Sequence, residues 1–262
     1  MGTLLEEIVN QYIDLQEVEA VAIGGSTPVK TSDKNSDIDI YIFSKTNVSI
    51  EVRENIIKSI SSKYESGCEY FGAGDEYLVD KLNKQLDVMY WNVDWFESVV
   101  DNTWVKCYPQ NGYTTCFLYT LKNFNIIYDK NNWLRNLQKV IDTSYPKALK
   151  ENIIKRNLML MKDKPFASYY EQIKKAIERK DVVSINHRIS AFVASYFDII
   201  FALNEQLHPG EKRLIQFTKN NCKILPKKFE TNLSRLFAQP NKATLSILDS
   251  IVGELKILIE SL

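Results

Sequence analysis

Apolar positions in the first half of the chain switch between helical and strand spacing. Residues 4–15 and 49–65 carry apolar side chains three and four apart, which predicts helices. Shorter apolar or alternating runs predict strands over residues 18–25, 37–44 and 85–92. The same criteria predict helices over residues 93–105, 114–124 and 131–142, and a strand over 125–129. This mixture is typical of an α/β or α+β domain built on a small sheet.

From about residue 136 onward the strand signals stop and helical spacing takes over. Helices are predicted over residues 147–162, 166–180, 182–207, 227–238 and 242–262. Aromatic side chains recur there at helical spacing and are expected mainly in the core: Tyr169, Tyr170, Phe192, Tyr196, Phe197 and Phe201. We therefore divide the chain into a mixed first domain, residues 1–135, and an all-α helical bundle, residues 136–262.

The net charge, the cysteine spacing and the hydropathy of the chain indicate its compartment and the kinds of partner it can bind. The 262-residue chain has 33 Lys plus Arg and 33 Asp plus Glu, so its formal net charge is zero. Because proteins that grip a nucleic-acid backbone are usually basic, a nucleic-acid partner is disfavoured. Four cysteines without paired metal-ligand spacing predict free thiols in a reducing compartment. The acidic start of the chain and the absence of a long apolar run predict a cytoplasmic protein with no membrane partner.

Two carboxylates sit on one face of the predicted strand at residues 37–44. Side chains two apart on a strand point the same way, so Asp37 and Asp39 share a face and Ile38, Ile40 and Ile42 take the other. Neighbouring carboxylates repel unless a cation lies between them, and Mg²⁺ prefers such oxygen ligands. The alternative is a solvated edge strand with two surface acids.

Two further features favour a phosphate and metal site over surface acids. Gly24, Gly25 and Ser26 follow an apolar strand, where a glycine turn allows a phosphate to approach backbone N–H groups closely. Asp87 interrupts another apolar strand, where an unpaired acid is costly to bury. If that strand pairs beside residues 37–44, the three carboxylates come together and suit two Mg²⁺ ions.

The segments GGS at 24–26, SDIDIYIF at 36–43 and LDVMYW at 86–91 together resemble the signature of the polymerase-β-like nucleotidyltransferase superfamily. The resemblance implies a small mixed sheet flanked by helices and two bound Mg²⁺ ions. It also implies transfer of a nucleoside monophosphate from an NTP to a hydroxyl, with ATP as the first candidate for the NTP. It implies that Asp37 and Asp39 bind metal, and that Asp87 binds the second metal and helps to activate the acceptor. The candidate nucleotide-binding residues are Gly24, Gly25, Ser26, Lys30, Ser36, Lys212 and Arg213. Lys30 stands where many relatives have a further glycine.

The second half is similar to bacterial nucleotidyltransferases with a helical C-terminal domain, some related to antibiotic-modifying enzymes, through NIIYDKNNWL and FALNEQLHPGEKRL. The resemblance implies that residues 1–135 are catalytic and that 136–262 bind the substrate. Lys212 and Arg213 either reach phosphates there or lie on a solvated surface after a helix start at Pro209. We expect a monomer or homodimer that transfers the nucleotide to a small molecule, with an aminoglycoside- or lincosamide-like antibiotic as the most concrete candidate.

Two other functions stay open at this point. The acceptor is alternatively an RNA or a protein, or the chain is a nucleotide-binding regulatory module without catalysis. Asp75 and Glu76, in a glycine-containing stretch expected to be a loop, either bind a cationic acceptor, act as a base, or face solvent.

Overall fold

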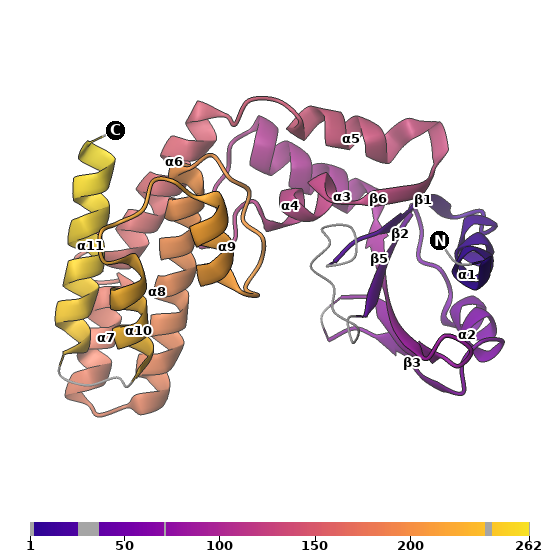
Figure 1. Ribbon diagram of the computed structural model, residues 1–262, viewed down its shortest axis with the longest axis horizontal. Coiled ribbons are helices and arrows are strands. Elements are labelled where there is room, and N and C mark those ends of the chain that lie inside the picture. The colour runs from indigo at the N-terminus through magenta and orange to yellow at the C-terminus, as the bar shows by residue number, and fades with distance from the viewer. Residues whose placement is uncertain (1–2, 26–36, 71, 239–242, 262) are drawn as a thin grey trace. The chain divides into compact units, whose positions relative to one another are not determined.

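A computed structural model describes residues 3–25, 37–70, 72–238 and 243–261 (Figure 1). The chain divides into two units, each with its own interior. The first consists of Met1–Asp101 and Thr120–Thr143, and the second of Asn102–Tyr119 and Ser144–Leu262. The assignment of catalysis to residues 1–135 and of substrate binding to 136–262 stays a prediction.

The first unit is built on a six-stranded mixed sheet in the order β3-β4-β5-β2-β1-β6. Its strands are β1 (Val18–Ile23), β2 (Ile38–Ser44), β3 (Lys63–Cys68), β4 (Gly74–Val79), β5 (Lys84–Asn92) and β6 (Asn125–Asp129). Its helices are α1 (Thr3–Ile13), α2 (Ile50–Lys58), α3 (Val93–Val100) and α5 (Trp133–Ile141). Strands β2 and β5 are parallel, and the other neighbouring pairs are antiparallel. The predicted α+β class with a small mixed sheet is confirmed.

The alternation of side chains along the central strands decides which face each residue takes. Ile40 and Ile42 are fully buried in a core that includes residues of α1 and α2, which lie on one side of the sheet (Figure 1). The opposite face carries Asp39, and after it the rings of Tyr41 and Phe43. These rings contact aromatic residues from β5, α3 and the segment that leads into β6. One face of the sheet is thus an apolar core, and the other begins with a carboxylate and continues as an aromatic layer.

Two sequence-based predictions about the first unit are wrong. The helix predicted over residues 49–65 ends at Lys58, and β3 begins at Lys63. Ser59 follows the helix and donates its hydroxyl to the Ile56 carbonyl at 2.7 Å, which closes the last turn. The stretch containing Asp75 and Glu76, expected to be a loop, is strand β4. Strand β3 has few apolar side chains and β4 begins with a glycine and two acids, so hydrophobic content does not reveal them.

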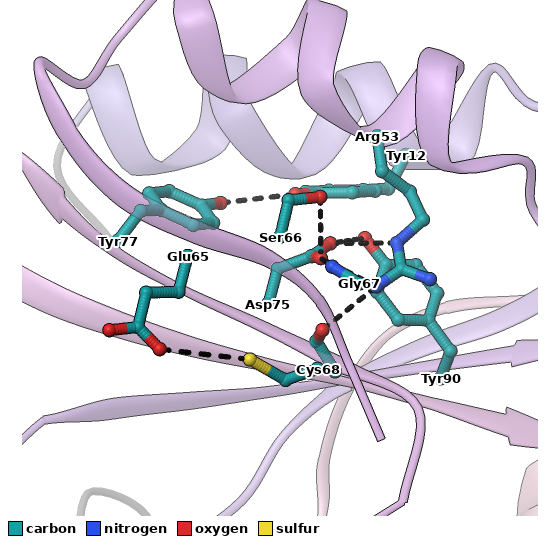
Figure 2. A network of polar contacts seen from close by, with 10 residues as sticks. Tyr12, Arg53, Glu65, Ser66, Gly67, Cys68, Asp75, Tyr77 and Tyr90 are labelled. Atoms are coloured by element: carbon teal, nitrogen blue, oxygen red, sulfur yellow. Dashed lines mark hydrogen bonds and ion pairs between the residues drawn. The ribbon is translucent and has the colours of Figure 1, made fainter. Parts of the chain in front are cut away.

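A buried ion pair holds β4 against α2 (Figure 2). The side chains of Arg53 and Asp75 are 7% and 0% exposed, and the Arg53 Nε donates to Asp75 Oδ2 at 2.9 Å. Ser66 Oγ, the Gly67 N–H and the Tyr90 hydroxyl also donate to the Asp75 carboxylate. Burial alone raises the pKa of Asp75, but the hydrogen bonds from Arg53, Gly67 and Tyr90 outweigh it and lower that pKa below its ordinary value.

Replacing Arg53 with Met is expected to lower the free energy of unfolding by about 3–5 kcal/mol, because the Asp75 charge would stay buried without its cation. The measurement is the urea midpoint at pH 7. The control is Lys58→Met on the same helix, which removes only an exposed pair with Glu54 and should leave the midpoint nearly unchanged. Equal midpoints for the two variants would contradict this role of the pair.

The regular structure described in the second unit is helical. Its elements are most of α4 (Cys116–Lys122), then α6 (Lys147–Leu158), α7 (Tyr169–Glu178), α8 (Val182–Leu203), α9 (Leu214–Asn221), α10 (Phe229–Ala238) and α11 (Thr244–Glu260). Short π-helical turns, Asp101–Val105 and Met159–Asp163, follow α3 and α6. Of the predicted core aromatics, the four on α8 are buried, and Tyr169 and Tyr170 pack against that core partly exposed. Helix α9 begins at Leu214, later than the helix start expected at Pro209.

A buried carboxylate ties the loop before α4 to the long helix α8. Asp198 is 1% exposed and accepts hydrogen bonds from the Thr114 N–H at 3.0 Å and the Thr114 hydroxyl at 2.6 Å. The Asn157 amide from α6 donates to it at 3.0 Å. Burial raises the pKa of Asp198 to about 6 despite these donors. Two of these three donors come from Thr114, so the carboxylate ties the loop before α4 to α8 within the second unit.

Among the described helices, none combines the length and the hydropathy that crossing a bilayer requires.

Candidate functional site

The parallel pairing of β2 with β5 places two of the predicted aspartates side by side. Asp39 and Asp87 are register partners in this pair, on the face opposite to buried Ile40 and Val88. Neighbouring strands lie about 4.8 Å apart, so the two carboxylates lie next to each other on the sheet. Both side chains are partly exposed, and Gln85 donates its amide to Asp87 at 2.9 Å. The predicted pairing of these two strands is confirmed, whereas the roles of the aspartates stay predictions.

The glycine turn after β1 lies directly against Asp39. The Gly24 N–H donates to the Asp39 carbonyl at 2.9 Å, which continues the β1–β2 ladder. Gly25 has a φ of +69°, and a Cβ there would lie 1.5 Å from Asp39 Oδ2. A Cβ at Gly24 would lie 2.5 Å from a ring carbon of Tyr41. Neither position has room for a larger residue, so the turn and the carboxylate form one closely packed unit.

Asp37 stands immediately before β2 and is exposed. Burial raises the pKa of Glu76, and the carboxylates of Asp87, Glu65 and Asp37 raise it further. The charge of Asp37 thus acts on a side chain of β4. Burial, followed by the charges of Asp39 and Asp87, raises the pKa of Tyr41 well above its ordinary value. Burial is the larger cause of both shifts, and the second cause, which they share, is the negative charge of the aspartates at this end of the sheet.

The acids continue across the sheet beyond the predicted set. Glu76 on β4 is the register partner of Asp87, and Glu65 on β3 is the partner of Glu76. We call Asp39, Asp87, Glu76 and Glu65 the acidic row. They occupy four neighbouring strands and span about 14 Å at the usual strand spacing. Among the described residues Glu76 has no ion-pair partner, in contrast to Asp75 beside it, whose side chain faces α2 and Arg53.

The donor chemistry of the three aspartates fits Mg²⁺. Carboxylate oxygens are hard ligands, and Mg²⁺ usually takes one or two of them and completes its shell with water and phosphate oxygens. Within the described ranges, no three His, Cys, Asp or Glu side chains are placed to enclose an ion together. Asp39 on β2 and Asp87 on β5 supply two carboxylates. Mg²⁺ commonly takes one or two carboxylate ligands from a protein when the phosphates of a nucleotide supply further ligands.

The other candidate residues either lie outside the described residues or belong to the second unit. Ser26, Lys30 and Ser36 lie outside the described residues. Lys212 and Arg213 belong to the second unit, whereas the aspartates belong to the first. Both are exposed in the segment before α9, and Arg213 has a φ of +54°. Their contact with phosphate stays a prediction.

Sequence reasoning missed the part of the site that depends on β3 and β4. It predicts Glu65 at the end of a helix and Glu76 in a loop, whereas both lie on strands. The alternation of Asp75, Tyr77 and Val79 with Glu76 and Leu78 is the signal that places Glu76 on the face opposite to the core. Glu65 shares its face only because its strand pairs in register with β4.

Comparisons with known proteins give matches to nucleotidyltransferase-type structures. Residues 113–214 match the family described as a domain of unknown function, DUF4037. No curated protein matches the sequence at a significant level. A nucleotidyltransferase-like protein from Exiguobacterium sibiricum 255-15 matches with 8% identity over 98% of this chain and 73% of that chain, with a TM-score of 0.46.

Two further solved structures match over nearly the whole chain. A spectinomycin adenyltransferase from Enterococcus faecialis, solved with ATP and spectinomycin, is 15% identical over 96% of each chain with a TM-score of 0.31. A CCA-adding enzyme from Thermotoga maritima, complexed with tRNA, is 11% identical over 100% of this chain and 82% of that chain with a TM-score of 0.31.

Proposed function

We propose that this protein is a Mg²⁺-dependent nucleotidyltransferase that moves a nucleoside monophosphate from an NTP, ATP in first place, to a hydroxyl group. The observation that carries the proposal is the register of β2 and β5, which sets Asp39 beside Asp87 with the Gly24–Gly25 turn packed against Asp39. A turn that admits only glycine allows a phosphate to approach the backbone closely. Two adjacent carboxylates beside such a turn suit the metal that accompanies a triphosphate.

In this mechanism the acceptor hydroxyl attacks the α-phosphorus in line with the leaving group. The new acceptor O–P bond forms, the bond between the α-phosphorus and the bridging oxygen breaks, and pyrophosphate leaves with that electron pair. Asp87 accepts the hydroxyl proton on a carboxylate oxygen. Asp37 and Asp39 with Asp87 would hold Mg²⁺, which neutralises the phosphate charge when bound. Positioning and charge neutralisation supply most of the rate, and no covalent enzyme intermediate forms.

The acidic row favours a cationic small molecule as the acceptor. Asp39 and Asp87 occupy the metal side of the row, and Glu76 and Glu65 continue it over β4 and β3. Glu76 and Glu65 are exposed, and carboxylates so placed attract an ammonium group beside Asp87. An amine-bearing, hydroxyl-rich compound of the aminoglycoside type has both the nucleophile and the charge that this surface suits.

Glu76→Gln is expected to raise the KM for a cationic acceptor about two- to fivefold at low salt, with kcat nearly unchanged, because the lost attraction acts on binding alone. The measurement is a steady-state titration of the acceptor at saturating NTP. Glu178→Gln on α7, which removes an exposed charge from the second unit, is the control. If the KM for an uncharged hydroxyl acceptor rises by the same factor, the charge of Glu76 does not select the acceptor.

The test of the proposed function is pyrophosphate release with Mg²⁺, each of the four NTPs, and a panel of acceptors. The panel contains amine-bearing and uncharged hydroxyl compounds, together with tRNA and a protein mixture. Release that depends on a small cationic acceptor supports the proposal. Release only with tRNA or protein would move the acceptor to a macromolecule, and NTP binding without release in every case would contradict catalysis.

A further inference from the structure

Strand β6 forms one edge of the sheet, with β1 as its single neighbour among the described strands. Apart from the ladder with β1, no main-chain hydrogen bond within the described ranges involves residues 125–128. The N–H and C=O groups on the outer side of an edge strand can pair with another chain. The outer side of β6 is therefore a template on which a further strand can form.

Charge distinguishes the two edges of this sheet. Both edge strands have a register shift against their inner neighbour. The other edge, β3, carries the exposed charges of Lys63 and Glu65, and charged side chains on an edge oppose pairing with a further strand. Residues 125–128 of β6 carry no charge, and Asp129 at its end is engaged by Arg135. Pairing with another chain is thus disfavoured at β3 and possible at β6.

A groove of about 550 Å³ runs beside β6, between this strand, the end of α4 and helix α5. Phe124, Ile126 and Ile141 give it an apolar floor. The Gln138 amide donates to the Leu121 carbonyl at 2.9 Å, which ties α5 to the end of α4 and fixes the walls. A peptide that pairs with an edge strand gains affinity from main-chain hydrogen bonds and specificity from pockets for its alternate side chains. The edge and the groove together provide both.

The charge of the groove favours acidic side chains in the peptide. Arg135 lines the groove, but its charge is balanced by Asp129 at 3.2 Å. Lys122 and Lys139 also line it, are exposed, and have no ion-pair partner among the described residues. Asp142 is the single acid among the lining residues. The two lysines therefore leave an excess of positive charge beside the apolar floor.

We propose that β6 and this groove bind an extended acidic segment of another protein, which adds to the sheet as a further strand. Side chains alternate along a strand, so one face of the segment places apolar side chains on the floor and carboxylates near Lys122 and Lys139. A second copy of β6 lacks this charge pattern, because its one acid, Asp129, is already held by Arg135 and by the start of α5. The surface lies apart from the acidic row, so the inference does not depend on the proposed function.

The test measures peptide binding by fluorescence polarisation, with the peptide Glu-Thr-Leu-Thr-Leu-Thr-Glu as the probe. Its Glu and Leu side chains share one face when the peptide is extended. One control peptide has Lys in place of both Glu residues. A second control is methylated on two consecutive central backbone nitrogens, so that a lost N–H group faces β6 in either register.

Two double variants of the full chain test the place of binding. Lys122→Glu with Lys139→Glu reverses the charge of the groove at exposed positions. Lys174→Glu with Lys175→Glu makes the same change on exposed positions of α7 in the second unit. We expect the unmodified protein and the α7 variant to bind the acidic peptide equally. The groove variant should bind it at least about tenfold more weakly and prefer the Lys peptide, and methylation should weaken binding by about tenfold.

Each of four results would overturn the inference. They are equal affinity of the groove variant and the α7 variant for the acidic peptide, equal affinity of the methylated peptide, and no binding by the unmodified protein at about 1 mM peptide. The fourth is a dimer in sedimentation velocity that the peptide dissociates, which would assign the edge to a second copy. Nucleotide transfer enters none of these measurements, so the inference and the proposed function stand or fall separately.

Discussion

Asp39→Asn is expected to lower nucleotidyl transfer by at least about 100-fold while the protein stays folded. Asn keeps the shape of the side chain and removes the charge that attracts the metal and its phosphates. Asp39 lies beside Asp87 and against Gly25, so its carboxylate is at the centre of the proposed site. The measurement compares kcat for pyrophosphate release with that of the unmodified protein at saturating NTP, acceptor and Mg²⁺.

Thermal unfolding of the same preparation shows whether the Asn variant is folded. The substitution should leave the packing of the core unchanged, because Asp39 points away from buried Ile40 and is partly exposed. A folded Asp39→Asn protein that keeps more than about a tenth of the original turnover would show that the carboxylate is not part of the catalytic machinery.

Gly25→Ala is expected to reduce turnover by about 100-fold for a steric reason. The added Cβ would fall 1.5 Å from Asp39 Oδ2, so the carboxylate or the turn must move. The residue also has a φ of +69°, which costs an Ala about 1 kcal/mol. The displacement acts on the reacting geometry, so we expect the loss mainly in kcat, with a smaller change in unfolding temperature.

Gly210→Ala separates the steric effect from the backbone effect. Gly210 has a φ of +97°, but a Cβ there meets nothing within 4 Å. The two variants share the cost of a positive φ, and only Gly25→Ala pushes on the aspartate. If both variants lose the same amount of activity and stability, close packing between the turn and Asp39 is not what the site requires.

The central strands and their aspartates could be predicted because their pattern is local. Ile38, Ile40 and Ile42 alternate with polar or aromatic residues, and that alternation fixes which face Asp39 takes. The same holds for Val88 and Asp87 on β5. Only the pairing of the two strands had to be assumed, and the structure confirms it.

The missed features all depend on contacts between residues far apart in the chain. Strand β3 has the sequence KYESGC, which contains one large apolar side chain and follows a helix closely, so its spacing continues the helical pattern. The acidic row needs the register of β3 with β4 and of β4 with β5, which periodicity within one segment does not contain. The pairing of Arg53 with Asp75 across α2 and β4 is non-local in the same way.

The arrangement of charge on the sheet bears on the acceptor of the proposed reaction. The acidic row suits a metal and a cationic acceptor. A neutral net charge for the whole chain conceals this local concentration of carboxylates. Salt should therefore weaken binding of the cationic acceptor, since it relies on attraction at an exposed surface.

The most direct measurement of the central claim is the mass of the acceptor after incubation with the protein, NTP and Mg²⁺. We predict that a cationic hydroxyl compound gains one nucleoside monophosphate for each pyrophosphate released, and that Asp39→Asn forms no such product. An NTP that binds while no small molecule, tRNA or protein in the mixture gains a nucleotide would contradict the proposed function, as would product formed equally by the Asn variant.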